Sequence, residues 1–457
     1  MAKSTQAAKD GVGPETAGIP PLFVDRSFWG ITATQFLGAF NDNLYKQTLL
    51  LMFVGVSLGG AEFDFQGPAT IAFAVPFILF SGFAGYLSDR YRKRTVIVAS
   101  KVAEIVVMVA ATIGFVIHAQ TGFTTFLLVY LVGVLFLMGS QSAFFGPGKY
   151  GVLPELFRKG DLPQANSLIL MTTFVAVIFG SWLAGLLKEN FEHQLWLVGL
   201  VAVGIGAVGT WTSTLLRKTP AVAPDLELEV DSLAIPGDVR EVLGRDRQLL
   251  RALLATSYYW LAAAFVQLTV NVVGKNQLDL SDSATSLMVG AVSIGIAAGS
   301  ALGAPLLGHK VRLLPPYIAG WFTIACMVVM AIPGFSLTHW LGYYGLVVVL
   351  MLVGASTAFF LIPLQVIIQI RPPQSLKGRI IATQNLMNWI GITAAGAVYF
   401  ASSWVIDRLG WPPSWNYLCV AAVLVLMMLT VFPKADSADS AVDTDTSKRL
   451  RLARRRR

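Results

Sequence analysis

Long apolar stretches separated by short polar segments dominate this chain. Twelve of them are long enough to cross a lipid bilayer, because a spanning helix needs about 20 apolar residues at a rise of about 1.5 Å each. Their approximate bounds are 28–57, 67–88, 95–118, 123–145, 164–187, 194–216, 248–274, 284–307, 316–334, 337–360, 379–406 and 412–432. The pattern therefore predicts an all-α integral membrane protein with twelve transmembrane helices.

The polar segment in the middle of the chain divides the twelve stretches into six and six. Ser-Ala-Phe-Phe at 142–145, ending the fourth stretch, recurs as Thr-Ala-Phe-Phe at 357–360, ending the tenth. Gly85 and Gly303 occupy matching places in the second and eighth stretches. These matches predict two pseudo-symmetric six-helix bundles from a duplicated unit. The predicted division is a tail at 1–27, bundles at 28–216 and 248–432, a linker at 217–247 and a basic tail at 433–457.

Composition and charge place the chain in a membrane and orient it there. Hydrophobic residues make up 55% and charged residues only 13%, whereas a soluble domain has about 25% charged residues. If both termini are cytoplasmic, the outer loops hold only Lys188, Lys275 and Arg408 of the 34 basic residues. The positive-inside tendency favours this orientation. The net charge of +8 then follows from topology and gives no reason to expect a nucleic-acid partner.

The first apolar stretch carries polar and charged residues near its middle, namely Asn41, Asp42, Asn43 and Lys46. An ionisable group at this depth costs several kcal/mol unless it faces protein or water, and such groups usually mark a path for substrate or ions. Gln35, Asp42 and Lys46 are spaced i, i+7 and i+11, which returns to one helix face. The spacing predicts a polar stripe facing a central cavity. A structural ion pair between Asp42 and Lys46 is the alternative.

A second pair of charges lies inside the third stretch. Lys101 and Glu104 are within one helical turn of each other. This spacing favours a local ion pair.

The loop after the second stretch, 85–94, reads Gly-Tyr-Leu-Ser-Asp-Arg-Tyr-Arg-Lys-Arg. It resembles the major facilitator signature, in which Gly is followed four residues later by Asp-Arg and a basic cluster. Arg92 departs from the usual pattern, which often has Gly there. The resemblance implies a major facilitator fold, with Gly85, Asp89 and Arg90 as gating residues and Asp89 and Arg90 helping to hold the outward-facing state. A purely topological role would explain residues 92–94 but not Asp89.

Two longer motifs carry a more specific resemblance. Residues 35–43 and residues 142–156, which include Pro147-Gly148-Lys149-Tyr150-Gly151, resemble the bacterial lysophospholipid transporter (LplT) family over most of the chain. The resemblance implies that Asp42 and Lys149 help form the pathway for a lysolipid headgroup. A basic residue at this position is also expected from topology alone, so both interpretations of Lys149 stay open.

The seventh stretch departs from this family. Stand-alone members place an arginine seven residues after a Trp, and from Trp260 that position is Gln267. The chain therefore looks closer to the branch often fused to acyltransferase and acyl-ACP synthetase domains. Gln267, Asn271 and Lys275 are spaced i, i+4 and i+8 along one face. They are predicted either to complete the polar path or to join helices by hydrogen bonds.

The expected function is transport of lysophosphatidylethanolamine-like lipids from the outer to the inner leaflet of a bacterial cytoplasmic membrane, where a separate acyltransferase/acyl-ACP synthetase re-acylates them. One alternative is a proton-coupled exporter of amphipathic compounds with Asp42 as proton carrier. Another is a non-transporting scaffold that docks an acyltransferase. No nucleotide-binding loop or metal-ligand cluster is evident, and no enzyme activity, cofactor or metal is expected. The predicted substrate-binding residues are Gln35, Asp42, Asn43, Lys46, Lys149, Gln267 and Asn271.

Overall fold

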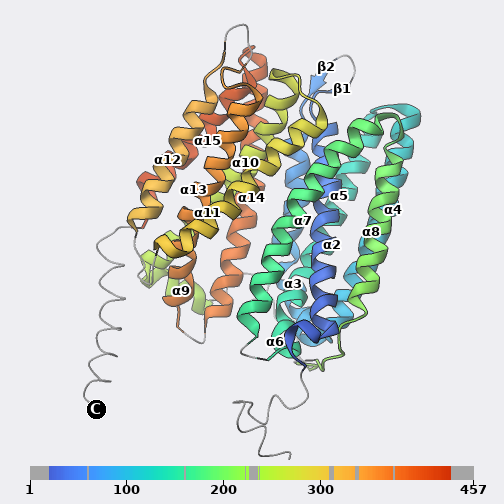
Figure 1. The fold of residues 1–457 in the computed structure, drawn as a ribbon, viewed down its shortest axis with the longest axis vertical. Coiled ribbons are helices and arrows are strands. Elements are labelled where there is room, and N and C mark those ends of the chain that lie inside the picture. The colour runs from blue at the N-terminus through green and yellow to red at the C-terminus, as the bar shows by residue number, and fades with distance from the viewer. Residues whose placement is uncertain are drawn as a thin grey trace, which may run out of the picture.

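The computed structural model describes residues 20–58, 61–158, 161–221, 223–225, 235, 237–307, 313–334, 339–373 and 376–433. Two groups of six long helices lie side by side (Figure 1). The N half contains α2 (Arg26–Met52), α3 (Gln66–Arg90), α4 (Lys93–Thr121), α5 (Thr125–Gly151), α7 (Leu162–Asn190) and α8 (Trp196–Ser213). The C half contains α10 (Arg247–Val272), α11 (Asp282–Leu307), α12 (Leu314–Ala331), α13 (Gly342–Ile370), α14 (Lys377–Arg408) and α15 (Asn416–Thr430).

Shorter elements connect these helices. An antiparallel hairpin of β1 (Val56–Leu58) and β2 (Ala61–Phe63) joins α2 to α3. The other short helices are η2 (Leu22–Val24), α6 (Leu153–Leu156), η3 (Glu192–Gln194), α9 (Gly237–Arg245), the π-helix η5 (Val273–Gln277) and η8 (Pro413–Trp415).

Within the described ranges, eleven helices are long and apolar enough to cross a membrane. The twelfth long helix, α2, has 27 residues but carries Asn41, Asp42, Asn43 and Lys46, which lower its hydropathy. The all-α fold of twelve transmembrane helices in two bundles is confirmed. The predicted residue bounds of the bundles, linker and tails stay a prediction, and the tails 1–19 and 434–457 lie outside the described residues.

Two helices end well beyond the residues at which the sequence predicted their ends. The fourth and tenth stretches were expected to end at 145 and 360, but α5 continues to Gly151 and α13 to Ile370, with Pro147 and Pro363 inside them. Proline is tolerated in membrane helices because neighbouring helices and small backbone adjustments compensate for the lost hydrogen bond. Lys149 therefore lies in the last turn of α5 and not in a loop after it.

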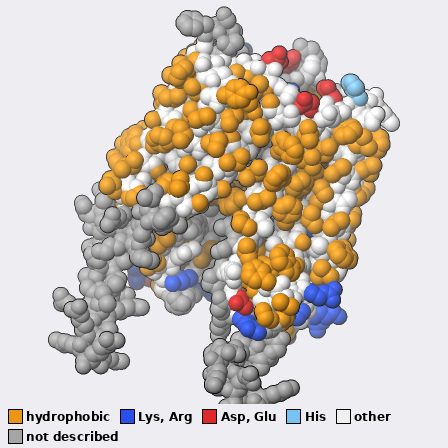
Figure 2. Space-filling model, viewed as in Figure 1, with side chains coloured by type: hydrophobic (Ala, Val, Ile, Leu, Met, Phe, Trp, Pro, Cys, Tyr) orange, Lys and Arg blue, Asp and Glu red, His pale blue; other side chains and the backbone are white. Residues whose placement is uncertain are grey.

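The two ends of the molecule differ in charge. Figure 2 shows hydrophobic side chains over the middle, most of the visible Lys and Arg at the lower end, and His and most of the visible acidic side chains at the upper end. We call the lower end, where α3 is followed by α4, the basic end. We call the upper end, which carries the β1–β2 hairpin, the hairpin end.

The halves approach each other most closely at the hairpin end. A Cβ atom on Gly67 of α3 would lie 2.6 Å from the carbonyl oxygen of Gly396 in α14, and one on Gly396 would lie 2.7 Å from the carbonyl oxygen of Gly67. A Cβ atom on Gly185 of α7 would lie 2.3 Å from the carbonyl oxygen of Asp282 in α11. From that contact α11 slants away from α7 towards the basic end (Figure 1). Only glycine permits these approaches.

Candidate functional site

A buried ion pair lies where three helices of the N half meet. Lys101 and Glu104, both in α4, pair directly, and each side chain is only 1% exposed, so the predicted local pair is confirmed. Asn41 of α2 donates from Nδ2 to Glu104 Oε1 (2.8 Å) and to the carbonyl oxygen of Ala202 in α8 (3.1 Å). A Cβ atom on Gly38 would lie 2.8 Å from Lys101 Nζ. The absence of a side chain at Gly38 therefore makes room for the buried ammonium.

Asp42 faces the fourth helix of the same half. Ser142 Oγ in α5 donates to Asp42 Oδ2 at 2.7 Å, and Gln141 Nε2 donates to Oδ1 at 3.4 Å. The carboxylate is half-buried. Glu104, Lys101 and Lys149 are near enough for their charges to act on it. Asp42 is thus held in place by neutral donors and surrounded by fixed charges of both signs.

Lys149 extends this cluster towards the basic end. Its Nζ lies 4.8 Å from the ring centroid of Tyr150 and 5.8 Å from that of Phe145. Lys101 Nζ lies 5.6 Å from the same Phe145 ring. Within the described part of the chain, Lys149 has no carboxylate within 4.0 Å. Its ammonium is stabilised by aromatic faces and remains available to an anion.

The polar residues that were predicted to form one stripe on α2 contact different neighbours. Gln35 Nε2 donates to Thr173 Oγ1 in α7 (3.1 Å), and Asn43 Nδ2 donates to the carbonyl oxygen of Ala39 in its own helix (2.8 Å). Lys46 Nζ lies 5.5 Å from the ring centroid of Phe73 in α3. Among the described residues no ion pair joins Lys46 to Asp42. The alternative that they form a structural pair is therefore wrong for this conformation.

Gln267 and Asn271 of α10 lie at the contact between the halves and not beside Asp42. Gln47 Nε2 of α2 donates to Asn271 Oδ1 (2.9 Å), and Asn271 Nδ2 donates to Gln66 Oε1 at the start of α3 (2.8 Å). Gln267 Nε2 donates to Gln47 Oε1 (3.3 Å). These bonds join helices, as one of the two predicted interpretations requires.

The same network continues to the loop before α3. Gln66 Nε2 donates to Tyr399 Oη of α14 at 3.2 Å, and Tyr399 Oη donates to Asp64. The backbone N–H of Gln66 donates to Asp64 Oδ1 at 2.9 Å. We call Gln47, Asp64, Gln66, Gln267, Asn271 and Tyr399 the hairpin-end network.

Asp64 is the titratable group of this network outside the membrane-spanning segments. Burial raises the pKa of its carboxyl from 3.8 to about 6. The hydrogen bonds from Tyr399 and Gln66 lower the pKa and so oppose burial, whereas the charge of Asp407 adds to the rise. Because these donors and neighbours come from both halves, we expect the pKa of Asp64 to change when the halves separate.

An ion-pair cluster flanks the network. Lys188 Nζ of α7 lies 2.7 Å from Asp282 Oδ2 of α11 and so joins the two halves, and Lys275 Nζ lies 2.9 Å from Asp282 Oδ1. Lys275 was expected to continue the polar face of α10, but α10 ends at Val272 and η5 follows. Within η5, Lys275 pairs with Asp282 instead.

The signature loop lies at the basic end. Asp89, with a side chain 55% exposed, is 3.9 Å from Lys93 Nζ of its own half, and its carbonyl oxygen accepts from Ala223 N at 3.0 Å. Arg90 lies over the ring of Tyr86, 5.7 Å from its centroid. A Cβ atom on Gly85 would meet open space. In this conformation Asp89 pairs within the N half, and the expected gating role stays a prediction.

Gln47, Asp64, Gln66 and Tyr399 were not predicted from the sequence as part of the site. Gln47 follows Lys46 directly, so its amide lay within the polar run and could have been included. Asp64 and Gln66 lie between two apolar stretches, where polar residues are ordinary. Tyr399 lies in an apolar stretch, and its partner comes from the other half. Only the fold brings these residues together.

Two comparisons with known proteins decide the family. The profile described as Major Facilitator Superfamily matches residues 31–396. The chain is 30% identical over 368 residues to "Lysophospholipid transporter LplT" of Escherichia coli O1:K1 / APEC, covering 78% of this chain and 83% of that protein. The chain belongs to the LplT family of the Major Facilitator Superfamily. A second LplT relative, from Enterobacter sp. (strain 638), is 29% identical over 370 residues, covering 79% of this chain and 85% of that protein.

Solved structures agree with this membership at the level of the fold. The crystal structure of a POT family transporter in complex with 5-aminolevulinic acid matches with a TM-score of 0.66 and 12% identity. The match covers 90% of this chain and 97% of the POT family transporter chain. As an LplT-family facilitator, the chain is therefore a multi-pass membrane transporter.

Proposed function

We propose that this LplT-family facilitator moves lysophospholipids, lysophosphatidylethanolamine above all, from the outer to the inner leaflet of a bacterial cytoplasmic membrane. Transport would proceed by alternating access of the two halves. A separate acyltransferase/acyl-ACP synthetase would then re-acylate the lipid in the inner leaflet. Beside the LplT relatives, the observation that carries the proposal is the half-buried Asp42 within the membrane span, with Lys149 near enough for its charge to act on Asp42.

Orientation follows from charge. The basic end carries Arg90, Arg92, Lys93 and Arg94 in one short connection, together with the arginines at the start of α10. Basic residues accumulate in cytoplasmic loops. The basic end would then face the cytoplasm, and both termini would lie on that side.

The charge cluster suits a phosphoethanolamine headgroup. Asp42 would pair with the headgroup ammonium, while Ser142 and Gln141 keep the carboxylate oriented. Lys149 would take the phosphate, which suits a compact ammonium charge. Ser142, Phe145 and Lys149 are spaced i, i+3 and i+7 and so share one face of α5. The ammonium and the phosphate of one zwitterionic headgroup would thus bind Asp42 and Lys149, respectively, along the same transport path.

The conformation suggests how access alternates. The hairpin-end network and the Lys188–Asp282 pair hold the halves together at the hairpin end, and α11 diverges from α7 towards the basic end. This arrangement is inward-facing in the proposed orientation. The network bonds are mostly between neutral groups, worth about 0.6 kcal/mol each in a membrane protein. They can therefore exchange with water when the halves separate.

A proton-coupled exporter is the second candidate. It is favoured by one observation: the half-buried Asp42 lies near a second carboxylate, Glu104, whose charge acts on it. In an exporter, transport would depend steeply on a pH gradient, and Asp42→Asn would remove this dependence. In the proposed lysolipid transporter, Asp42→Asn reduces transport at every pH.

The test uses the full chain reconstituted in vesicles with fluorescent lysophosphatidylethanolamine in one leaflet. Leaflet crossing is followed by chemical quenching of the accessible label. We expect wild type to exceed empty vesicles and Asp42→Asn to be at least about tenfold slower, because truncating one partner of a desolvated charge pair costs about 2–5 kcal/mol. Glu62→Gln, which removes an exposed carboxylate on β2, is the matched control. Equal crossing in wild-type and empty vesicles would reject the proposal.

A further inference from the structure

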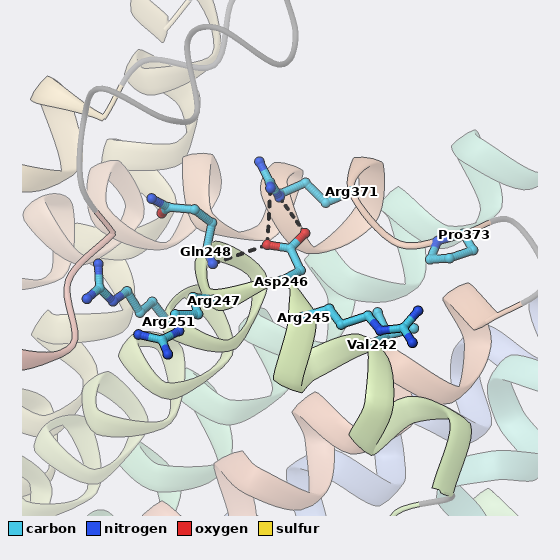
Figure 3. A pocket seen from close by; sticks show the side chains of 8 residues that line it. All are labelled: Val242, Arg245, Asp246, Arg247, Gln248, Arg251, Arg371 and Pro373. Carbon is cyan, nitrogen blue, oxygen red and sulfur yellow. Dashed lines mark hydrogen bonds and ion pairs between the residues drawn. The ribbon is translucent and has the colours of Figure 1, made fainter.

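A basic pocket lies at the basic end of the C half, away from the charge cluster of the N half. It has a volume of about 720 Å³ and lies where α9 is followed by α10 and where α13 ends. Figure 3 shows the lining side chains Val242, Arg245, Asp246, Arg247, Gln248, Arg251, Arg371 and Pro373. Four of these eight residues are arginines, and only one is acidic.

The acid of the pocket is already neutralised. Asp246 caps α10, because its Oδ1 accepts from the backbone N–H groups of Gln248 (3.1 Å) and Leu249 (3.0 Å). Arg371, just after α13, binds the same carboxylate with two bonds, Nε to Oδ2 at 2.9 Å and a terminal nitrogen to Oδ1 at 3.1 Å. Bidentate pairs of this kind are well oriented. Asp246 and Arg371 therefore form a fixed wall of the pocket. Because the Asp246 carboxylate is already paired with Arg371, it does not neutralise the charges of the other arginines.

Arg247 and Arg251 lie one turn apart on α10 and next to each other in Figure 3. Like charges at i and i+4 destabilise a helix by a few tenths of a kcal/mol. In the part of the chain that the structure describes, neither guanidinium has a carboxylate within 4.0 Å, whereas Arg245 pairs with Glu241 at 2.6 Å. Topology accounts for basic residues at this end, but not for two adjacent guanidinium groups that lack an acidic partner among the described residues. A bound anion would resolve their repulsion.

The position of Arg247 and Arg251 indicates which kind of anion would bind between them. They lie in the first two turns of a predicted membrane-spanning helix, and the turn that follows, from Ala252 to Ala255, is apolar. Lipid headgroups lie at this level, and clusters of basic residues there attract anionic lipids. The planar, multidentate guanidinium also suits phosphate.

We propose that Arg247 and Arg251 bind the phosphate of an anionic phospholipid headgroup in the leaflet at the basic end. The site is distinct from the transport path in the N half, and its existence does not depend on which lipid is transported. The fixed Asp246–Arg371 wall keeps the start of α10 in place and so presents both guanidinium groups to the same headgroup.

The test measures lipid binding to the purified full chain in detergent by native mass spectrometry. Phosphatidylglycerol is compared with phosphatidylcholine of the same acyl chains. We expect wild type to prefer phosphatidylglycerol and the double variant Arg247→Gln, Arg251→Gln to bind it roughly 30-fold more weakly, at about fivefold per arginine near an anionic lipid. The matched control, Arg26→Gln with Arg240→Gln, removes two exposed arginines outside the pocket and should change binding less than threefold. An equal loss in the control would overturn the proposal.

Two further arms complete the test. Added inorganic phosphate distinguishes a lipid site from a soluble phosphate site: if millimolar phosphate displaces phosphatidylglycerol completely, the lipid assignment is wrong. If the double variant fails to fold, a photoactivatable phosphatidylglycerol is crosslinked to wild type. Labelling of peptides that contain residues 242–251 or 371–373 would support the site. Labelling found only in other peptides would contradict it.

Discussion

The two halves of the molecule differ where their first, third and fourth helices meet. In the N half this junction holds charges: Asp42, the Lys101–Glu104 pair and the Ser142 hydroxyl that donates to Asp42. In the C half the same three helices meet through hydroxyl groups. Tyr259 Oη lies 2.7 Å from Thr323 Oγ1, which lies 2.6 Å from Ser356 Oγ, and all three side chains are buried.

This difference indicates that the two halves of the duplicated fold have different roles. A neutral hydroxyl cluster costs little to bury once it is hydrogen-bonded, so it stabilises a bundle without attracting ions. Embedded charges cost more and are usually functional. We infer that the N half recognises a charged headgroup, while the C half contributes Gln267, Asn271 and Tyr399 to the hairpin-end network.

Removing one charge of the buried pair should have the largest effect on stability. Glu104→Gln leaves Lys101 buried without its counter-charge, which costs about 3–5 kcal/mol. We expect a clear fall in the thermal unfolding midpoint in detergent. The double variant Lys101→Met, Glu104→Gln should recover most of this loss. A single variant as stable as wild type would show that water reaches Lys101.

Weakening the hairpin-end network should shift the balance between conformations. Asn271→Leu leaves Gln47 Nε2 without its acceptor and Gln66 Oε1 without its donor, at a cost of about 1–2 kcal/mol. Spin-label distances between the halves at the hairpin end should lengthen in a larger fraction of molecules. Asn388→Leu is the control, because Asn388 accepts from Ser257 inside the C half (3.2 Å). Equal shifts in both variants would contradict a specific role for the network.

Asp64 should make this balance depend on pH. Its pKa is raised to about 6 in the closed hairpin end, so this state binds a proton more tightly than an open state in which the carboxyl returns towards 3.8. The closed fraction should rise as pH falls through 6 and level off near 4. The same distance measurement between pH 4 and 8 checks this, and Asp64→Asn should abolish the dependence. An unchanged slope in that variant would assign it to another group.

The hydroxyl cluster of the C half should show the smallest effect. Thr323→Val removes a hydroxyl that bonds to Tyr259 and Ser356, and a typical hydrogen bond contributes about 1 kcal/mol. The unfolding midpoint should fall slightly, and lysolipid transport should stay near the wild-type rate. A transport loss as large as that of a charge variant of the N half would end the distinction between the halves.

The sequence predicted the helices better than the contacts between them. Apolar length is a local property, so twelve helices and the embedded Asp42 could be recognised directly. The ends of α5 and α13 were placed too early, because polar residues interrupt the apolar stretches before the helices themselves end at Gly151 and Ile370. The network around Gln66 and Tyr399 could not be predicted, because neutral groups leave little signal and their pairing depends on how the two halves meet.

In the proposed transport path, Asp42 recognises the headgroup ammonium. The most direct test measures leaflet crossing of lysophosphatidylethanolamine and of its N-acetylated form by wild type and by Asp42→Asn. We predict that acetylation slows wild type about tenfold and leaves the rate of Asp42→Asn unchanged, because both changes remove the same interaction and coupled changes do not add. If acetylation slows both proteins by the same factor, Asp42 does not bind the ammonium and the account is wrong.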